Sequence, residues 1–202
     1  MKSTGLDNVQ DGKLLYHLTK LKNMRAIIED GLCSRKSLNK RNLQFYDVAD
    51  AKIINKRKEL GLDQYIPFHF HPYSAFDNAV KNTYEKEKFV YICIKRAFAE
   101  YNNFKILVSH PLSKEDCILY DYKEGIERID WDTMKTKGRN DSYAKNVKMA
   151  ECITKKRIPA ELFQCVYVPD SDTKKYITDL FQNKGITEHP PYTDIQPKWF
   201  VN

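Results

Sequence analysis

FVYICI, residues 89–94, is the most continuous apolar stretch of the sequence and gives its clearest strand signal. β-Branched and aromatic side chains without an interrupting glycine or proline are typical of a buried strand. Shorter runs with strand composition lie on both sides of it. They cover residues 14–19 (LLYHLT), 65–70 (YIPFHF), 105–109, 118–120, 151–153 and 163–168 (FQCVYV). Pro67 indicates that its run is an edge strand or the start of a strand.

Helical patterns are concentrated in the first half of the chain. Apolar residues recur at helical spacing from Leu21 to Ile28, before Gly31, and residues 49–60 form a charged segment that ends at Gly61. A short helix over 76–81 and a last one over 171–182, with Ser171 or Asp172 as its N-cap, are also predicted. Many short strands with early helices predict an α+β fold. One domain over residues 1–202 is expected, with residues 1–13 as a lead-in and a tail at 190–202 that docks on the body.

The composition excludes several classes of protein. Hydrophobic residues make up 42% and aromatic residues 12% of the 202 residues, which is typical of a globular chain. Only 7 glycines occur and no glycine-rich phosphate loop is present, so a bound nucleotide must be held by side chains and scattered backbone groups. The 5 cysteines form no CxxC pair, which argues against a zinc knuckle. No secretion signal or membrane span is recognised, and we expect a cytoplasmic protein and no membrane contact.

The net charge of +7 favours a polyanionic partner, because neutralising phosphates releases condensed counterions. A generically basic protein is the alternative. The segment 133–150 concentrates the charge: it is polar, with few apolar anchors, and we predict a mobile loop that holds a polyanion. Its basic residues are Lys135, Lys137, Arg139, Lys145 and Lys148, against the single acid Asp141.

Three side chains suggest chemistry. His17 and Thr19 stand two apart in a predicted strand and therefore face one side, where they can bond a ribose hydroxyl or an amide. Glu151 heads a strand directly after the basic segment, so its carboxylate can stabilise a cationic transition state. Two of them have a structural alternative: His17 can be a satisfied strand histidine, and Glu151 can belong to a surface salt bridge.

Arg57 and an aromatic cluster complete the candidates. The guanidinium of Arg57 can fork onto a pyrophosphate or an acidic nucleobase edge, or Arg57 can be an exposed helix residue. The alternating run from Tyr65 to Tyr73 should place half of its side chains in the core and leave half to stack on a nicotinamide or a flipped base. Its histidines have no carboxylate or thiolate at ligand spacing, so no metal is expected.

These motifs occur in an order that resembles the DarT-like DNA ADP-ribosyltransferases. His17-x-Thr19 with Asn23, followed by an apolar helix and Gly31-Leu32, is similar to the H-x-T-x3-N opening of that family. Ile53 to Arg57 resembles its arginine-bearing helix, Tyr65 to Phe70 its Y-V-P-F-x-F strand, and Lys148 to Glu151 its x-x-A-E. The resemblance covers roughly residues 14–168.

The resemblance implies a split β-sandwich and an enzyme that transfers ADP-ribose from NAD⁺ to a base in single-stranded DNA. Glu151 and Arg57 would be catalytic. The implied cofactor-binding residues are His17, Leu18, Thr19, Asn23, Tyr65 and Phe70. Those implied or inferred for nucleic acid are His71, Tyr73, Phe76, Asp77, Lys135, Lys137, Arg139, Lys145 and Lys148. The family's members are bacterial toxins that a macrodomain-containing antitoxin neutralises. A monomer is expected.

Two departures bear on the target base. The thymidine-directed members continue with N-P-R-x-x-M-L, whereas this chain has His71 to Asp77, HPYSAFD. Their D-G-N-A element is also missing. The segments around His110, Ile129 to Trp131 and Glu151 resemble the guanosine-directed branch instead, so guanine is the expected target and thymine the next. RNA as substrate, a protein or tRNA-like substrate, and a non-catalytic nucleic-acid-binding module of the same fold remain as alternatives.

Overall fold

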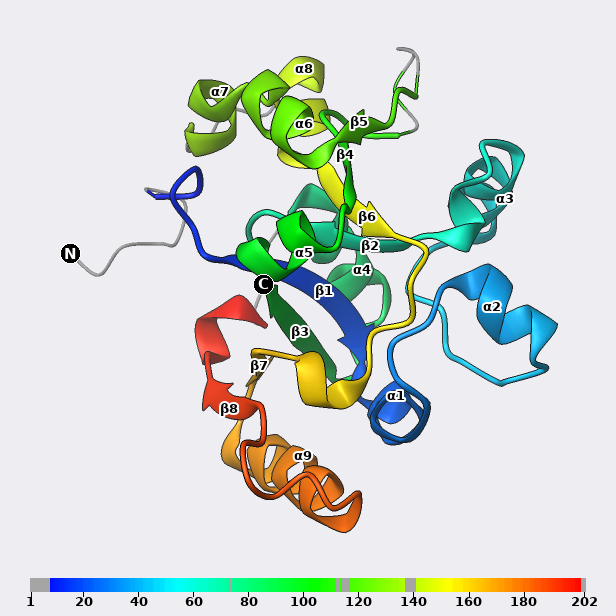
Figure 1. The fold of residues 1–202 in the computed structure, drawn as a ribbon, viewed down its shortest axis with the longest axis vertical. Coiled ribbons are helices and arrows are strands. Elements are labelled where there is room, and N and C mark those ends of the chain that lie inside the picture. Colours follow the sequence, from blue (N-terminus) through cyan, green and yellow to red (C-terminus); the bar gives the residue numbers. More distant parts are fainter. Residues whose placement is uncertain (1–7, 73, 112, 114–116, 137–140, 201–202) are drawn as a thin grey trace.

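The computed structural model describes residues 8–72, 74–111, 113, 117–136 and 141–200. It contains one mixed sheet in the order β5-β4-β6-β2-β1-β3-β7-β8 (Figure 1). The α+β class is therefore confirmed. The strands are β1 (Leu14–Lys20), β2 (Ile66–His69), β3 (Phe89–Lys95), β4 (Lys105–Leu107), β5 (Tyr120–Asp121), β6 (Glu151–Thr154), β7 (Cys165–Val168) and β8 (Tyr192–Ile195).

The sheet divides between β1 and β2. β1 pairs with β3 along its whole length, from Leu14 to Lys20, but its register with β2 is the single pair Tyr16↔His69. β2 in turn pairs with β6 along its whole length, with His69 opposite Glu151. The two halves therefore separate next to β1, and a ligand can enter between them.

Helices surround this sheet in three groups (Figure 1). The helical elements near the split are η1 (Leu21–Asn23), α1 (Met24–Asp30), α2 (Arg35–Lys40), α3 (Ala51–Glu59), η2 (Leu62–Gln64) and α4 (Ala75–Thr83). α6 (Tyr122–Arg128), α7 (Trp131–Lys135) and α8 (Ser142–Lys148) lie around the β4–β5 end, and α5 (Arg96–Tyr101) lies over the middle of the sheet, in contact with β3 and α6. η3 (Ala160–Leu162), α9 (Ser171–Asn183) and η4 (Pro197–Trp199) belong to the β7–β8 end.

The second half of the chain is more helical than the sequence suggested. The segment 133–150, expected as a loop, contains the end of α7 and the whole of α8. α8 forms because Asp141 accepts a hydrogen bond from the Ala144 amide as an N-cap, and because Ala144 and Val147 are buried. Two small side-chain anchors were too weak a pattern to predict this helix. In the same way, Asp170 rather than Ser171 or Asp172 caps α9, since its carboxylate accepts from the Thr173 amide.

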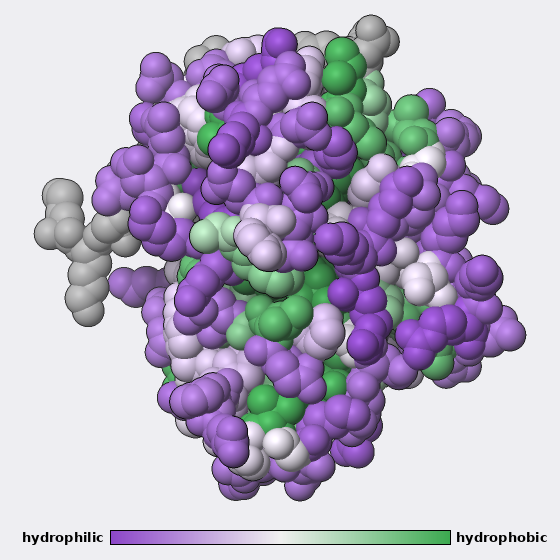
Figure 2. All heavy atoms as spheres, viewed as in Figure 1, coloured by the Kyte–Doolittle hydropathy of each residue, from purple (hydrophilic) through white to green (hydrophobic). Residues whose placement is uncertain are grey.

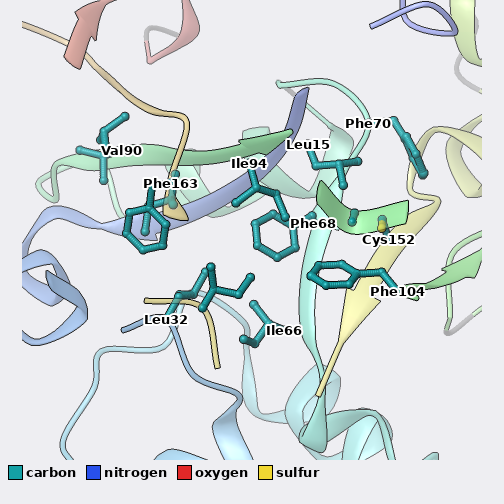
Figure 3. Packing of buried hydrophobic residues seen from close by; sticks show 14 of the residues in the cluster. Leu15, Leu32, Ile66, Phe68, Phe70, Val90, Ile94, Phe104, Cys152 and Phe163 are labelled. Carbon is teal, nitrogen blue, oxygen red and sulfur yellow. The ribbon is translucent and has the colours of Figure 1, made fainter. Parts of the chain in front are cut away.

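The main core lies on one side of the sheet and includes Leu15, Phe68, Ile94 and Phe104 (Figure 3). The rings of Phe68 and Phe104 are 6.5 Å apart. Pro67 interrupts neither β2 nor its pairing with β6, because it stands as the second residue of the strand. The strand-start reading of Pro67 is therefore correct and the edge reading wrong. At the other end of the sheet, Trp199 packs 4.5 Å from the ring of Tyr167.

Candidate active site

A pocket of about 190 Å³ opens at the division of the sheet. Its walls come from β1, α1, the segment 31–49, α3, β2, the start of α4, the turn after β4, and the start of β6. Hydrophilic residues dominate the viewed face of the molecule, including the region over α2 and α3, while apolar residues gather in its middle (Figure 2). The lining joins residues that are far apart in the sequence, from His17 to Glu151.

Arg57 of α3 and Glu151 of β6 form a buried ion pair in the wall of this pocket. Nη1 and Nη2 of Arg57 donate to Oε1 and Oε2 of Glu151 at 2.7 and 3.0 Å. Their relative exposures are only 7% and 4%. Such a two-point contact fixes both side chains in one plane. The exposed-helix reading of Arg57 and the surface-salt-bridge reading of Glu151 do not match this geometry.

The pair keeps both groups charged. Burial by itself would raise the pKa of Glu151, but the charge of Arg57 and its hydrogen bonds outweigh burial and lower that pKa below the usual range. For Arg57, burial lowers the pKa and the adjacent carboxylate more than restores it, so the pKa is raised. The site therefore holds a fixed carboxylate whose two oxygens are oriented by the guanidinium.

His17 lies across the division of the sheet. Its Nδ1 is 2.8 Å from the Pro67 carbonyl oxygen of β2, so Nδ1–H donates and Nε2 keeps its lone pair. Burial lowers the pKa of His17, which keeps the ring neutral at pH 7. A neutral imidazole with one accepting nitrogen suits a ribose hydroxyl donor.

Asn23 holds the segment that covers the pocket. Its amide donates to Oγ1 of Thr19 at 3.1 Å and to the Tyr46 carbonyl at 2.9 Å, and its oxygen accepts from the Tyr46 amide at 2.9 Å. A second clamp joins Arg35 to Asp47, with two hydrogen bonds of 2.6 and 2.9 Å. Segment 43–49 is thus tied to β1, η1 and α2. Sequence reasoning missed this clamp, because an Arg and an Asp twelve residues apart form no recognisable motif.

Two polar atoms in the pocket region lack partners. Nδ1 of His69 and Oδ1 of Asp77 are both buried, and neither has a hydrogen-bond partner in the described structure. Both residues line the pocket, as do Phe76 and His110. The Asp77 carboxylate is held through Oδ2, which accepts from the Ser74 amide and from the Tyr91 hydroxyl, each at 3.1 Å. Sequence reasoning included His69 in the alternating aromatic run and His110 in the resemblance to the guanosine-directed branch, but gave neither a role in catalysis. The alternation of β2 places Pro67 and His69 on one side.

The other sequence candidates differ in their relation to the pocket. Leu18, Tyr65 and Phe76 line the pocket, although the side chain of Leu18 belongs mainly to a core cluster. Phe70 does not reach the pocket: it is 2% exposed and packs edge-on against Trp131 at 5.4 Å, because alternation along the strand turns it into the core. The residues that lie outside the described part of the chain are Tyr73, Lys137 and Arg139.

His71 also lies in the interior rather than at the pocket. Its ring nitrogens are 2.8 Å from the Pro72 carbonyl oxygen and 3.2 Å from that of Lys148. Among the lysines of α7 and α8, Lys145 is exposed, Lys135 is 3.5 Å from Asp132, and the Lys148 ammonium donates to the Thr136 carbonyl at 2.6 Å. Lys148 therefore helps to join α7 to α8.

The described residues also bear on metal and membrane binding. Within them, no group of three or more His, Cys, Asp or Glu side chains is arranged to hold a metal ion. No helix in the described ranges is both long and apolar enough to cross a membrane.

One family model matches the chain, over residues 16–201, and it describes "ssDNA thymidine ADP-ribosyltransferase, DarT". The match includes His17, Arg57 and Glu151. No curated protein matches the sequence.

Solved structures share the fold. Thermus sp. 2.9 DarT in complex with ADP-ribosylated ssDNA is 17% identical, with a TM-score of 0.78 over 95% of this chain and 97% of that one. The same Thermus protein in complex with NAD⁺ gives 15% identity and a TM-score of 0.73, over 94% and 98%. Thermosipho africanus DarTG in complex with ADP-ribose gives 19% identity and a TM-score of 0.72, over 94% of this chain but 51% of that chain.

Proposed function

The chain belongs to the DarT family of single-stranded-DNA ADP-ribosyltransferases, and from that premise we propose that it binds NAD⁺ in the pocket beside β1 and transfers ADP-ribose to guanine, releasing nicotinamide. The observation that carries the proposal is the buried Arg57–Glu151 pair in the pocket wall. An ion pair that served only to stabilise the fold could lie anywhere in the interior, whereas this one lies in the wall of a pocket.

Glu151 has the properties that this chemistry requires. Breaking the bond between nicotinamide and ribose leaves an oxocarbenium-like sugar, whose charge a nearby carboxylate stabilises. Arg57 holds that carboxylate ionised and oriented, so no reorganisation is needed during the reaction. Arg57 would also meet the phosphates of NAD⁺ or the incoming base.

The NAD⁺ itself would be held by side chains in place of a glycine-rich loop. His17 offers an accepting Nε2 to a ribose hydroxyl, and Thr19 offers a hydroxyl that Asn23 already orients. Tyr65 and Leu18 line the same pocket. Asn23 would act mainly by keeping segment 43–49 closed over the cofactor.

Guanine is favoured over thymine by one structural observation. Asp77 has a buried, unpartnered carboxylate oxygen beside the pocket, and a carboxylate accepts readily from the amino edge of guanine. Phe76 lies next to it and offers an aromatic face for stacking. Thymine is the second candidate, because the family model carries that base in its description. In either case the base must be unstacked, so a single strand should react better than a duplex.

Membership of the DarT family also suggests where the DNA strand binds and which protein is the partner. Lys135 and Lys145 are the described basic residues of the segment 133–150 best placed to meet phosphates, since Lys148 is engaged with Thr136. We also propose a macrodomain-containing antitoxin that removes the ADP-ribose, action as a monomer, and a cytoplasmic site of action.

A base-omission experiment tests the proposed target. The protein is incubated with NAD⁺ and with single-stranded oligonucleotides that each lack one base, and adducts are read by mass spectrometry. We expect no adduct on the oligonucleotide without guanine. An adduct lost only when thymine is absent would establish thymine as the target. Equal modification of RNA of matched sequence would contradict the preference for DNA.

A further inference from the structure

His69 is a buried pocket histidine to which the chemistry above assigns no role. It ends β2 directly opposite Glu151 in the antiparallel β2–β6 pair. Side chains opposed in this way point to the same face with Cβ atoms about 4.5–5.5 Å apart. The residue is 8% exposed and lines the pocket, and its Nδ1 is buried without a hydrogen-bond partner. An unsatisfied buried polar atom destabilises the folded state, so a site that keeps one is suited to a ligand that completes it.

The transfer reaction needs a proton acceptor that the ion pair does not supply. When a ring or amino nitrogen of a base attacks the ribose, its N–H proton must leave. Both oxygens of Glu151 already accept hydrogen bonds from Arg57, and the lowered pKa of Glu151 makes it a weak base. Arg57 is a cation with a raised pKa, so it has no lone pair to offer. A third group must therefore take the proton.

The other histidines near the site are engaged differently. His17 donates through Nδ1 to Pro67, and its remaining nitrogen is the one proposed above for a ribose hydroxyl. His71 contacts two backbone carbonyls in the interior. His110 lines the pocket from the turn after β4 and has interactions of its own. Imidazole is the side chain best suited to accept a proton near neutral pH.

We propose that His69 is the general base of the transfer, an inference that rests on the proposed function. The nitrogen lone pair of the base forms a bond to C1 of the nicotinamide ribose, and the bond from that carbon to nicotinamide breaks. The bonding pair leaves with nicotinamide, which departs as a neutral molecule. The N–H proton of the base passes to an imidazole nitrogen of His69. The product is a neutral ADP-ribosylated base and a protonated His69, which returns its proton to water on product release.

Groups around His69 suit this role. Glu151 stabilises the imidazolium that forms, as a carboxylate beside a catalytic histidine does. The ring of Phe76 lies 6.4 Å from that of His69 and gives it an apolar neighbour. The titratable or charged groups that face His69 from the elements packed around it are Glu151 and Arg57, His17 of β1, Asp77 of α4, His71 and His110.

The test compares wild type with His69→Gln on a single-stranded oligonucleotide that wild type modifies. General-base catalysis contributes about 10²–10⁴-fold, so kcat should fall at least about 100-fold. The KM for NAD⁺ should stay within about 3-fold, because ground-state binding does not use the proton acceptor. Wild type should lose rate on the acid side of its pH profile, and the residual rate of the variant should lack that limb. His189→Gln, which changes an exposed histidine, is the matched control.

A second variant separates chemistry from folding. His69→Ala leaves a space in the pocket wall, and added imidazole should restore part of its rate, whereas imidazole should not help His69→Gln. A folded His69→Gln variant with wild-type kcat and pH profile would overturn the assignment of His69 alone. Failure of imidazole to raise the rate of folded His69→Ala would also overturn it. If wild type itself forms no adduct with any oligonucleotide, the proposed function and this inference fail together.

Discussion

The Arg57–Glu151 pair should be strongly coupled in a double-mutant cycle. Arg57→Met and Glu151→Leu each leave one buried charge without its partner, at a cost of about 3–5 kcal/mol in unfolding free energy. The geometry supports this range, because each variant removes two hydrogen bonds of 2.7 and 3.0 Å to a charged group, worth about 1.5–3 kcal/mol each. At about 2–4 °C per kcal/mol for a chain of this size, Tm should fall by roughly 6–20 °C.

The double variant should be much less damaged than the sum of the single ones. With both charges gone, two apolar side chains of similar volume fill the site, and replacements of this kind are often close to neutral. The coupling energy should therefore exceed about 2 kcal/mol. Urea unfolding followed by circular dichroism measures it. The exposed pair of Lys175 and Asp179, 2.7 Å apart on α9, is the control and should give about 0.3–0.5 kcal/mol. A coupling for Arg57 and Glu151 no larger than this control would refute the buried pair.

Three further predictions concern the cofactor, the polyanion and pH. Asn23→Leu should release Tyr46 from its two backbone hydrogen bonds and raise the KM for NAD⁺ about tenfold, because a loss of about 1.4 kcal/mol in binding free energy weakens binding tenfold. An unchanged KM would mean that segment 43–49 does not cover the cofactor. Changing Lys135 and Lys145 to Ala should weaken oligonucleotide modification and leave NAD⁺ affinity unchanged. The slope of log binding constant against log salt concentration should become shallower by about 0.7 per lost phosphate contact, and a constant slope would show that these lysines are only solvated. The lowered pKa values of His17, His71 and His110 mean that the unfolded chain binds more protons below about pH 6.5, so Tm should drop between pH 7 and 5 in thermal melts.

The strands and the catalytic candidates could be predicted from local patterns. FVYICI lies in the interior strand β3, and YIPFHF contains β2, because continuous or alternating apolar residues report burial directly. His17, Arg57 and Glu151 were found through short motifs, and the fold brings His17, Arg57 and Glu151 to one pocket. The contact between Arg57 and Glu151 joins residues that are 94 positions apart in the sequence, and no local pattern predicts it.

Other features depended on tertiary context. α8 forms around two small buried side chains, so its polar sequence was indistinguishable from a loop. Phe70 was expected at the cofactor, but it follows β2 directly and packs in the core against Trp131, on the same side as Phe68. His69 was given no catalytic role, because a histidine in an alternating aromatic run, without metal-ligand neighbours, matches no catalytic motif. Only its register opposite Glu151 and its unpartnered Nδ1 reveal it.

The role of Glu151 is tested most directly by comparing wild type with Glu151→Gln in single-turnover reactions with NAD⁺ and single-stranded DNA. Adducts are followed by mass spectrometry and NAD⁺ binding by calorimetry. Because the carboxylate stabilises charge that develops only in the transition state, the variant should lose transfer while retaining NAD⁺ affinity within a few fold. Wild-type transfer by Glu151→Gln would contradict the assignment of Glu151 as the catalytic carboxylate.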